Sequence, residues 1–146
     1  MKVRYLLSFA AVAGLLVLAA CALSPPLTAE EQAALVSQHG VLSHEELKAH
    51  LIGHSIKGMS QGIGKTWIEF NDPDGTLRGK WTDDSNTWVG RWTITGPFYC
   101  WEYEGSSSGC YLIKLDGDKA VALDKDGSIA TDYHPETILQ GNPEGL

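Results

Sequence analysis

The sequence predicts a mainly β fold, which is an antiparallel meander or a small up-and-down β-barrel preceded by two short helices. Three observations predict it. Apolar and polar residues alternate through most of the chain after His54, short turn sequences rich in Gly, Asp and Asn separate these segments, and no helical periodicity interrupts them. Closing the meander into a barrel removes its exposed strand edges, so the barrel is the favoured form.

Two short helices are predicted within residues 28–53, ahead of the strands. Thr28 is followed three residues later by Glu31, and Ser43 is followed in the same way by Glu46. This spacing is typical of a capping box, in which the two side chains satisfy the free N–H groups at a helix start. We therefore expect one helix to begin after Thr28 and a second to begin after Ser43.

The strands are predicted within residues 54–140, and residues 141–146 are expected to form a flexible tail. Turn sequences such as DPDG at residues 72–75 and DKDG at residues 124–127 separate the strands. The expected strands cover residues 56–59, 66–71, 76–82, 87–95, 98–104, 110–115, 119–123 and 128–132.

Cys100 and Cys110 are predicted to form a disulfide bond. They flank a segment with the turn-forming sequence GSSS, and a hairpin centred near Gly105 places them opposite each other. Their spacing differs from the C-x-x-C pattern of redox-active pairs. Closing this short loop stabilises the fold by roughly 3 kcal/mol in the chain-entropy model.

The first residues predict export. Lys2 and Arg4 precede an apolar run over residues 6–20, which fits the roughly 7–15 apolar residues of a signal peptide and is shorter than the about 20 residues that span a bilayer. Residues 18–21, with the sequence LAAC, resemble the bacterial lipobox. This resemblance implies a signal peptide over residues 1–20 that is cleaved before Cys21, and acylation of Cys21.

The lipobox resemblance also implies a location in the cell envelope. Residues 21–27 are expected to be a lipidated tether to the membrane. In lipoproteins, Asp directly after the acylated Cys favours the inner membrane. Here Ala22 occupies that position, which favours an outer-membrane protein that faces the periplasm.

The charge of the chain excludes nucleic acid as a partner. Without Lys2 and Arg4, nine basic residues remain against 18 acidic ones, and contacts to phosphate backbones depend on clusters of Lys and Arg. The sequence also contains no recognisable set of metal ligands, and it predicts neither a metal site nor a cofactor.

The region from about residue 51 to residue 143 resembles a group of small exported β-domains of Gram-negative bacteria whose function is unknown. The resemblance implies the fold and supplies no catalytic residues. Turn glycines and core tryptophans are prominent among the residues that carry it, which are Gly53, Gly58, Gly62, Trp67, Glu69, Phe70, Pro73, Asp74, Gly75, Thr76, Arg78, Gly79, Trp81, Gly90, Trp92, Ile94, Cys100, Trp101, Tyr103, Cys110, Tyr111, Asp116, Gly117, Asp118, Gly141, Asn142 and Pro143. Lipocalins and avidins are barrels of the expected kind.

The density of aromatic residues is the main indication of function. Small barrels either fill their interior with side chains or hold one small ligand there. Packing in the core is one interpretation, and a ligand-lining role is the other. The candidate ligand-lining residues are Trp67, Trp81, Trp88, Trp92 and Trp101.

Three functions are compatible with these patterns. The first is a non-enzymatic, membrane-anchored module that binds an apolar small molecule or an envelope protein. The second is a periplasmic protease inhibitor, because known inhibitors of secreted metalloproteases have a similar size, a small barrel and a single disulfide. The third, and least favoured, is a glycan hydrolase that uses Glu102 and Glu104, which alternation places on one face of a strand. The sequence favours the first function.

Overall fold

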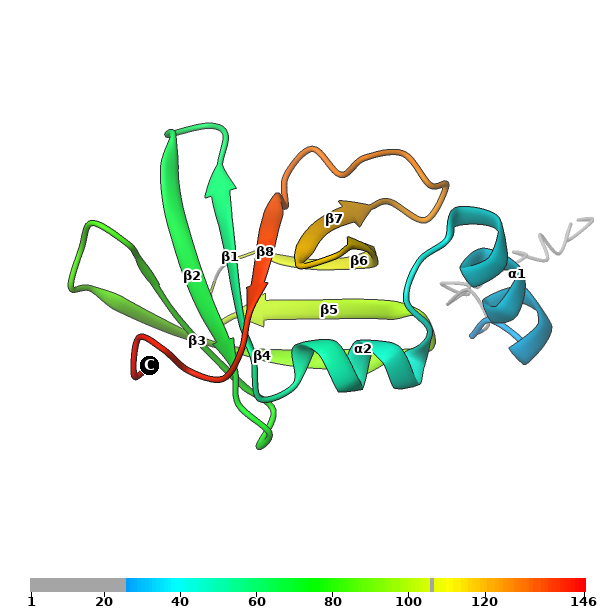
Figure 1. Cartoon of the computed structure of the whole chain (residues 1–146), viewed down its shortest axis with the longest axis horizontal. Coiled ribbons are helices and arrows are strands. Elements are labelled where there is room, and N and C mark those ends of the chain that lie inside the picture. Colours follow the sequence, from blue (N-terminus) through cyan, green and yellow to red (C-terminus); the bar gives the residue numbers. More distant parts are fainter. Residues whose placement is uncertain (1–25, 106) are drawn as a thin grey trace, which may run out of the picture.

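The computed structural model describes residues 26–105 and 107–146, which form a closed barrel of antiparallel strands preceded by two helices (Figure 1). Each strand pairs with the next one along the chain, and β1 also pairs with β8, which closes the barrel. The strands are β1 (Ser55–Ser60), β2 (Lys65–Asn71), β3 (Thr76–Trp81), β4 (Thr87–Thr95), β5 (Phe98–Tyr103), β6 (Ser108–Asp116), β7 (Lys119–Leu123) and β8 (Pro135–Leu139). The predicted mainly β fold is confirmed, whereas the expected signal peptide and Cys21 lie outside the described residues.

Both helices begin as the sequence predicts. The helices are α1 (Ala29–His39) and α2 (His44–Leu51), and each begins with a complete capping box. In α1 the Thr28 N–H donates to Glu31 Oε2 at 2.7 Å, and in α2 the Ser43 N–H donates to Glu46 Oε2 at 2.8 Å. Within residues 26–105 and 107–146, neither helix has the length and apolar composition needed to cross a bilayer.

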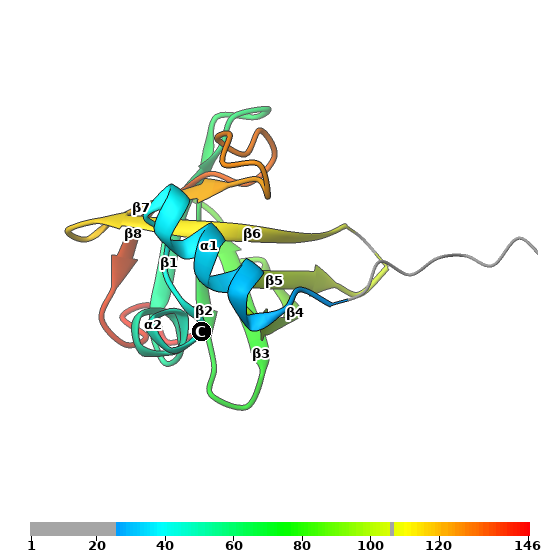
Figure 2. The same ribbon diagram turned by 90° about the vertical axis from the view of Figure 1, so that its right-hand side faces the viewer.

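The two helices cover different parts of the barrel. Helix α1 has no buried residue and lies outside the barrel wall in both ribbon views (Figures 1 and 2). Its half-buried Val36 packs against a small cluster formed by Val41, Leu112 and Leu123. Helix α2 buries Leu47 and Leu51 completely within the main core.

The order of the strands gives the barrel two different ends. One end, which we call the mouth, carries the β1–β2, β3–β4, β5–β6 and β7–β8 connections. The other end, the base, carries the β2–β3, β4–β5 and β6–β7 turns and the entry from α2 into β1. Fully buried side chains fill the base: Leu47, Leu51, Ile56, Leu77, Tyr99 and Ile113. Helix α2 therefore closes the base, and the mouth remains the open end.

The last predicted strand was wrong. Residues 128–132 make only an isolated bridge between Leu123 and Ile129, and the barrel is closed by β8 instead. The Asp126 side chain accepts the Ser128 N–H at 2.9 Å, which makes a tight turn where the strand was expected. Pro135 concealed the real strand in the sequence because a Pro within a run argues against a paired strand, although the first position of a strand tolerates it.

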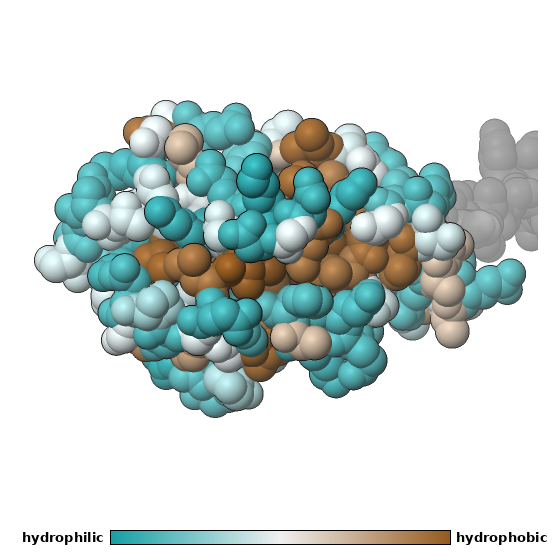
Figure 3. Space-filling view, in the orientation of Figure 1, coloured by the Kyte–Doolittle hydropathy of each residue, from teal (hydrophilic) through white to brown (hydrophobic). Residues whose placement is uncertain are grey.

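The barrel closes through a short ladder between β7 and β8. These strands pair only at Lys119 and Thr137, and the Ile138 N–H adds a bond to the Asp118 carbonyl oxygen at 3.0 Å. The half-buried Leu115 and Ile138 pack against the main core. In the view of Figure 1, β8 and β6 lie near the middle of the molecule. Figure 3, in the same orientation, shows a band of apolar side chains there. Apolar packing therefore contributes to closure where the hydrogen-bonded ladder is short.

The C-terminal residues contact the barrel. Ser55 Oγ donates to the Gly141 carbonyl oxygen at 2.9 Å, and Lys80 Nζ pairs with Glu144 Oε2 at 2.8 Å. These contacts place residues 141–146 beside β1 and β3, and the flexibility of this tail stays a prediction.

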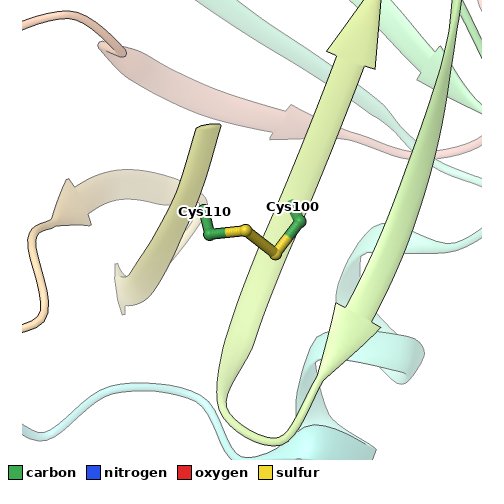
Figure 4. The surroundings of a disulfide bond; sticks show 2 residues. All are labelled: Cys100 and Cys110. Carbon is green, nitrogen blue, oxygen red and sulfur yellow. A yellow bond between two sulfur atoms is a disulfide. The ribbon is translucent and has the colours of Figure 1, made fainter. Parts of the chain in front are cut away.

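The expected disulfide joins Cys100 on β5 to Cys110 on β6, which are directly paired in the ladder (Figure 4). Both cysteines lie on the outer face, since their neighbours Tyr99, Trp101 and Tyr111 are buried inside the barrel. The bond therefore fixes the register of a hairpin whose inner face carries aromatic side chains.

Replacing both cysteines by serine should lower the free energy of unfolding by roughly 3 kcal/mol, because the unfolded chain loses a covalent constraint. Denaturant unfolding followed by circular dichroism measures this change, with the reduced wild-type chain as the control for the substitutions themselves. Equal stability of the oxidised wild type and the double variant would contradict a structural role for the bond.

Candidate functional site

A cavity of about 560 Å³ opens at the mouth of the barrel. Side chains of β1 to β5 line it together with residues of the β1–β2, β5–β6 and β7–β8 connections. Six of the lining residues are aromatic, and we call them the aromatic wall: Trp67, Trp81, Trp88, Trp101, Tyr103 and Tyr133. The cavity therefore lies above the buried residues of the base, and six of its 17 lining residues carry Trp or Tyr rings.

The rings of the aromatic wall contact one another in a continuous series. Trp81 and Trp88 meet edge to face with centroids 5.2 Å apart, and Trp101 and Tyr103 lie 5.1 Å apart. Tyr133 comes from the β7–β8 connection and stacks on Trp67 at 5.5 Å. Such pairs each stabilise a structure by about 0.5–1.5 kcal/mol beyond their buried area, so the wall holds its own geometry.

Inward-facing glycines make room for these rings. A Cβ atom on Gly79 would lie 2.6 Å from Trp88 Cε2 and 2.7 Å from Glu69 Cγ, closer than atoms can approach. A Cβ atom on Gly58 would lie 2.7 Å from Trp67 Cε2. The absence of a side chain at these positions lets the indoles cross the barrel interior and leaves space beside them.

Glu69 is the buried carboxylate of this site. Its side chain lies inside the barrel because it alternates with the buried Trp67 and Asn71 along β2, and only 3% of its surface is exposed. Glu69 Oε1 accepts hydrogen bonds from Trp88 Nε1 at 3.1 Å and from the Tyr103 hydroxyl. Glu69 Oε2 has no hydrogen-bond partner within residues 26–105 and 107–146.

Burial changes the acidity of this cluster. Removal of water from around the carboxylate raises the pKa of Glu69 to about 7, although the hydrogen bonds from Tyr103 and Trp88 oppose this rise. Burial also raises the pKa of Tyr103, and the nearby Glu69 charge adds to this effect. Glu69 therefore titrates near neutral pH, whereas the tyrosine hydroxyls around it stay protonated.

Other buried polar atoms in the interior also lack partners. Among the described residues, Trp101 Nε1 and the Tyr133 hydroxyl, both on lining residues, find no hydrogen-bond partner, and neither does Asn71 Nδ2. The Asn71 side chain is held from its other end, where Oδ1 accepts the Tyr99 hydroxyl at 2.7 Å. An unpaired buried polar group costs about 1–3 kcal/mol, so these atoms are suited to bind a group that enters the cavity.

The structure brings together four of the five tryptophans predicted to line a ligand site. Trp67, Trp81, Trp88 and Trp101 all line the cavity. Trp92 is absent from the lining, because it lies further toward the base on β4 and its Nε1 donates to the Asp72 carbonyl oxygen at 2.9 Å.

Of the two carboxylates considered for glycan hydrolysis, Glu104 lines the cavity and Glu102 does not. Glu102 is exposed on the outer face of β5, and Glu104 lies in the β5–β6 turn at the rim of the cavity. They do not face each other across the cavity. Glu69 was not predicted as a site residue, although the sequence contained a signal for it. Glu69 follows Trp67 by two residues in the same strand, so the two side chains share a face, and Trp67 was expected to point inward. A charged residue on the apolar face of a strand breaks the local pattern, and such breaks mark functional sites.

No cluster of metal ligands lies among residues 26–105 and 107–146, since no three His, Cys, Asp or Glu side chains converge there. No protein-family model, no curated protein and no solved structure matches this chain significantly. The site therefore has to be interpreted from its own geometry.

Replacing Gly79 by alanine should lower the free energy of unfolding by about 1–3 kcal/mol, because the added methyl group overlaps the Trp88 indole and Glu69. Gly62→Ala is the matched control at the rim, where an added Cβ atom meets nothing within 4 Å. Thermal or denaturant unfolding compares the two variants, and equal stabilities would contradict the close packing around Glu69.

Replacing Glu69 by glutamine should remove a pH-dependent loss of stability. Because folding raises the pKa of Glu69 from 4.5 to about 7, its contribution to stability is fully present below pH 4.5 and is lost as the pH rises through 7. Relative to the wild type, the variant should therefore become more stable by up to about 3 kcal/mol as the pH rises. Unfolding curves of both proteins between these pH values measure the difference, and a difference that stays constant with pH would contradict the burial of an ionisable Glu69.

Proposed function

We propose that this chain is a non-enzymatic binding protein of the cell envelope that holds one small organic molecule in the mouth cavity. The observation that carries the proposal is the open cavity of about 560 Å³, lined by the aromatic wall and by buried polar atoms without partners. Ligand sites in proteins have volumes of about 300–1,000 Å³ and combine apolar walls with a few convergent polar groups.

The arrangement of packed base and open mouth supports this function. Fully buried side chains gather at the base, whereas the mouth leaves aromatic side chains in contact with a cavity. A barrel that served only as a scaffold gains stability by filling its interior. The empty volume at the mouth is therefore most simply explained as space for a ligand.

The architecture is compatible with the same function. Lipocalins and streptavidin are antiparallel barrels of similar strand number whose interior is wide enough to hold one small ligand. A lipocalin-like or avidin-like use of this barrel remains part of the proposal.

Tethering to a membrane through Cys21 is supported by the lipobox sequence and leaves the cavity accessible. Helix α1, which follows the proposed tether, lies on the opposite side of the barrel from the β1–β2 and β3–β4 hairpins of the mouth (Figure 1). A tether that leads into α1 therefore joins the barrel away from these two hairpins. Ala22, directly after Cys21, favours the outer membrane.

The neutral dye N-phenyl-1-naphthylamine tests the cavity, because its fluorescence increases in apolar surroundings. We expect it to bind the wild type and to bind Trp81→Leu about tenfold more weakly, because Trp81 lines the cavity. Trp92→Leu is the matched control, since it removes an indole that does not line the cavity.

A fluorescence titration of the three proteins measures the affinities, after circular dichroism has verified that each is folded. An absence of dye binding to the wild type would overturn the proposed function. Equal weakening by both substitutions would show that the dye binds outside the cavity.

A further inference from the structure

We propose that the ligand of this cavity is an organic cation, namely a protonated amine on an apolar or aromatic body, whose N–H donates to the carboxylate of Glu69. This inference rests on the proposed function, because it names the chemical class of the molecule that the cavity holds.

The hydrogen bonds of Glu69 give the first argument. Both donors within reach, Trp88 Nε1 and the Tyr103 hydroxyl, bind the same oxygen, Oε1. The other oxygen, Oε2, is buried and has no partner in the part of the chain that the structure describes. A purely apolar ligand would seal the cavity with this acceptor unpaired, whereas a ligand N–H satisfies it.

The charges along the cavity give the second argument. Three lining residues are acidic, namely Glu69, Glu104 and Asp132, and His134 is the one histidine in the lining. Among the described residues, neither Lys nor Arg lines the cavity. An anionic ligand would therefore meet carboxylates and no permanent positive charge, while a cation is attracted both at the rim and at the floor.

The aromatic wall gives the third argument. Tyr103, which donates to Glu69, lies with its ring centroid 6.5 Å from Trp88 and 5.1 Å from Trp101. A cation that reaches Glu69 is therefore surrounded by ring faces and edges. Cations bind the faces of Trp and Tyr rings within about 6 Å of the centroid, and this attraction increases when water is excluded.

The protonation state of Glu69 gives the binding a pH dependence. The titratable groups around Glu69 inside the barrel are Tyr99, Tyr103 and Tyr133. Glu104, Asp132 and His134 lie at the rim of the cavity above it. The pKa of all three tyrosines is raised, so they stay neutral. Because the pKa of Glu69 is raised to about 7, its carboxyl group is neutral in mild acid and charged above neutral pH. A cation should therefore bind more tightly as the pH rises.

Three probes of similar shape and different charge test the ligand class: 2-phenylethylamine, which is a cation, 2-phenylethanol, which is neutral, and 3-phenylpropanoate, which is an anion. Titration calorimetry at about pH 8, where Glu69 is ionised and the amine is still protonated, compares them on the purified protein. We expect the amine to bind at least about tenfold more tightly than the alcohol, and the anion to bind weakest.

The variant Glu69→Gln should bring the affinities for amine and alcohol to within about threefold of each other, because it keeps the side-chain shape and removes the charge. The wild type provides a second measurement that does not depend on a variant folding. Its affinity for the amine should increase about tenfold between pH 6 and pH 8, while its affinity for the alcohol changes little. His134→Gln is the control for this experiment and should show the same increase, since it removes the histidine of the lining and leaves Glu69 in place.

Each outcome decides the proposal. Preference for the amine, lost in Glu69→Gln and rising with pH in the wild type, supports it. Binding of the alcohol or the carboxylate as tightly as the amine overturns it. The proposal is also overturned if the affinity for the amine no longer depends on pH in His134→Gln. If N-phenyl-1-naphthylamine binds the cavity but the amine does not displace it, the organic cation is wrong and the proposed function stands. If neither compound binds, both are wrong.

Discussion

The burial of Glu69 is the constraint on which the half of the barrel toward the mouth depends. Alternation along β2 points this side chain inward together with Trp67 and Asn71, and only 3% of its surface is exposed. A buried carboxylate needs hydrogen-bond donors, and here they come from β4 and β5. The indole of Trp88 reaches it because Gly79 has no side chain in its path. One acidic residue thus determines what its neighbours on three other strands must be.

The two ends of the barrel have different roles: the base contributes mainly to stability, and the mouth holds the proposed binding site. At the base, α2 buries two leucines in the main core, which also contains Tyr99 and Ile113. Toward the mouth, the rings of the aromatic wall support each other and surround a cavity instead of filling it. The disulfide on the outer face of β5 and β6 holds the register of the hairpin that carries Trp101 and Tyr103. A rigid frame of this kind keeps the polar atoms of the cavity in place before a ligand arrives, which reduces the entropy lost on binding.

Most of the fold was predictable because its signals are local. Capping boxes at Thr28 and Ser43, alternation in the strands and glycine-containing turns each depend on a few adjacent residues. The closing strand was not predictable in this way: Pro135 disguised it, and its partners on β1 are about eighty residues away in the chain. The tryptophans of the site were identified because aromatic residues stand out in composition. Glu69 was not, because its role depends on donors from β4 and β5 that only the closed barrel brings to it.

The most direct test of this account is the ionisation of Glu69 itself, followed by the carbon-13 chemical shift of its side-chain carboxyl group in a pH titration of the folded, ligand-free protein. The account predicts a midpoint near pH 7, because burial opposes the charged form. It also predicts that a saturating amine lowers this midpoint, because a bound cation stabilises the carboxylate. A midpoint near 4.5, the ordinary value for Glu, would show that the carboxylate is solvated and would contradict the buried acceptor on which both the cavity and its proposed ligand depend.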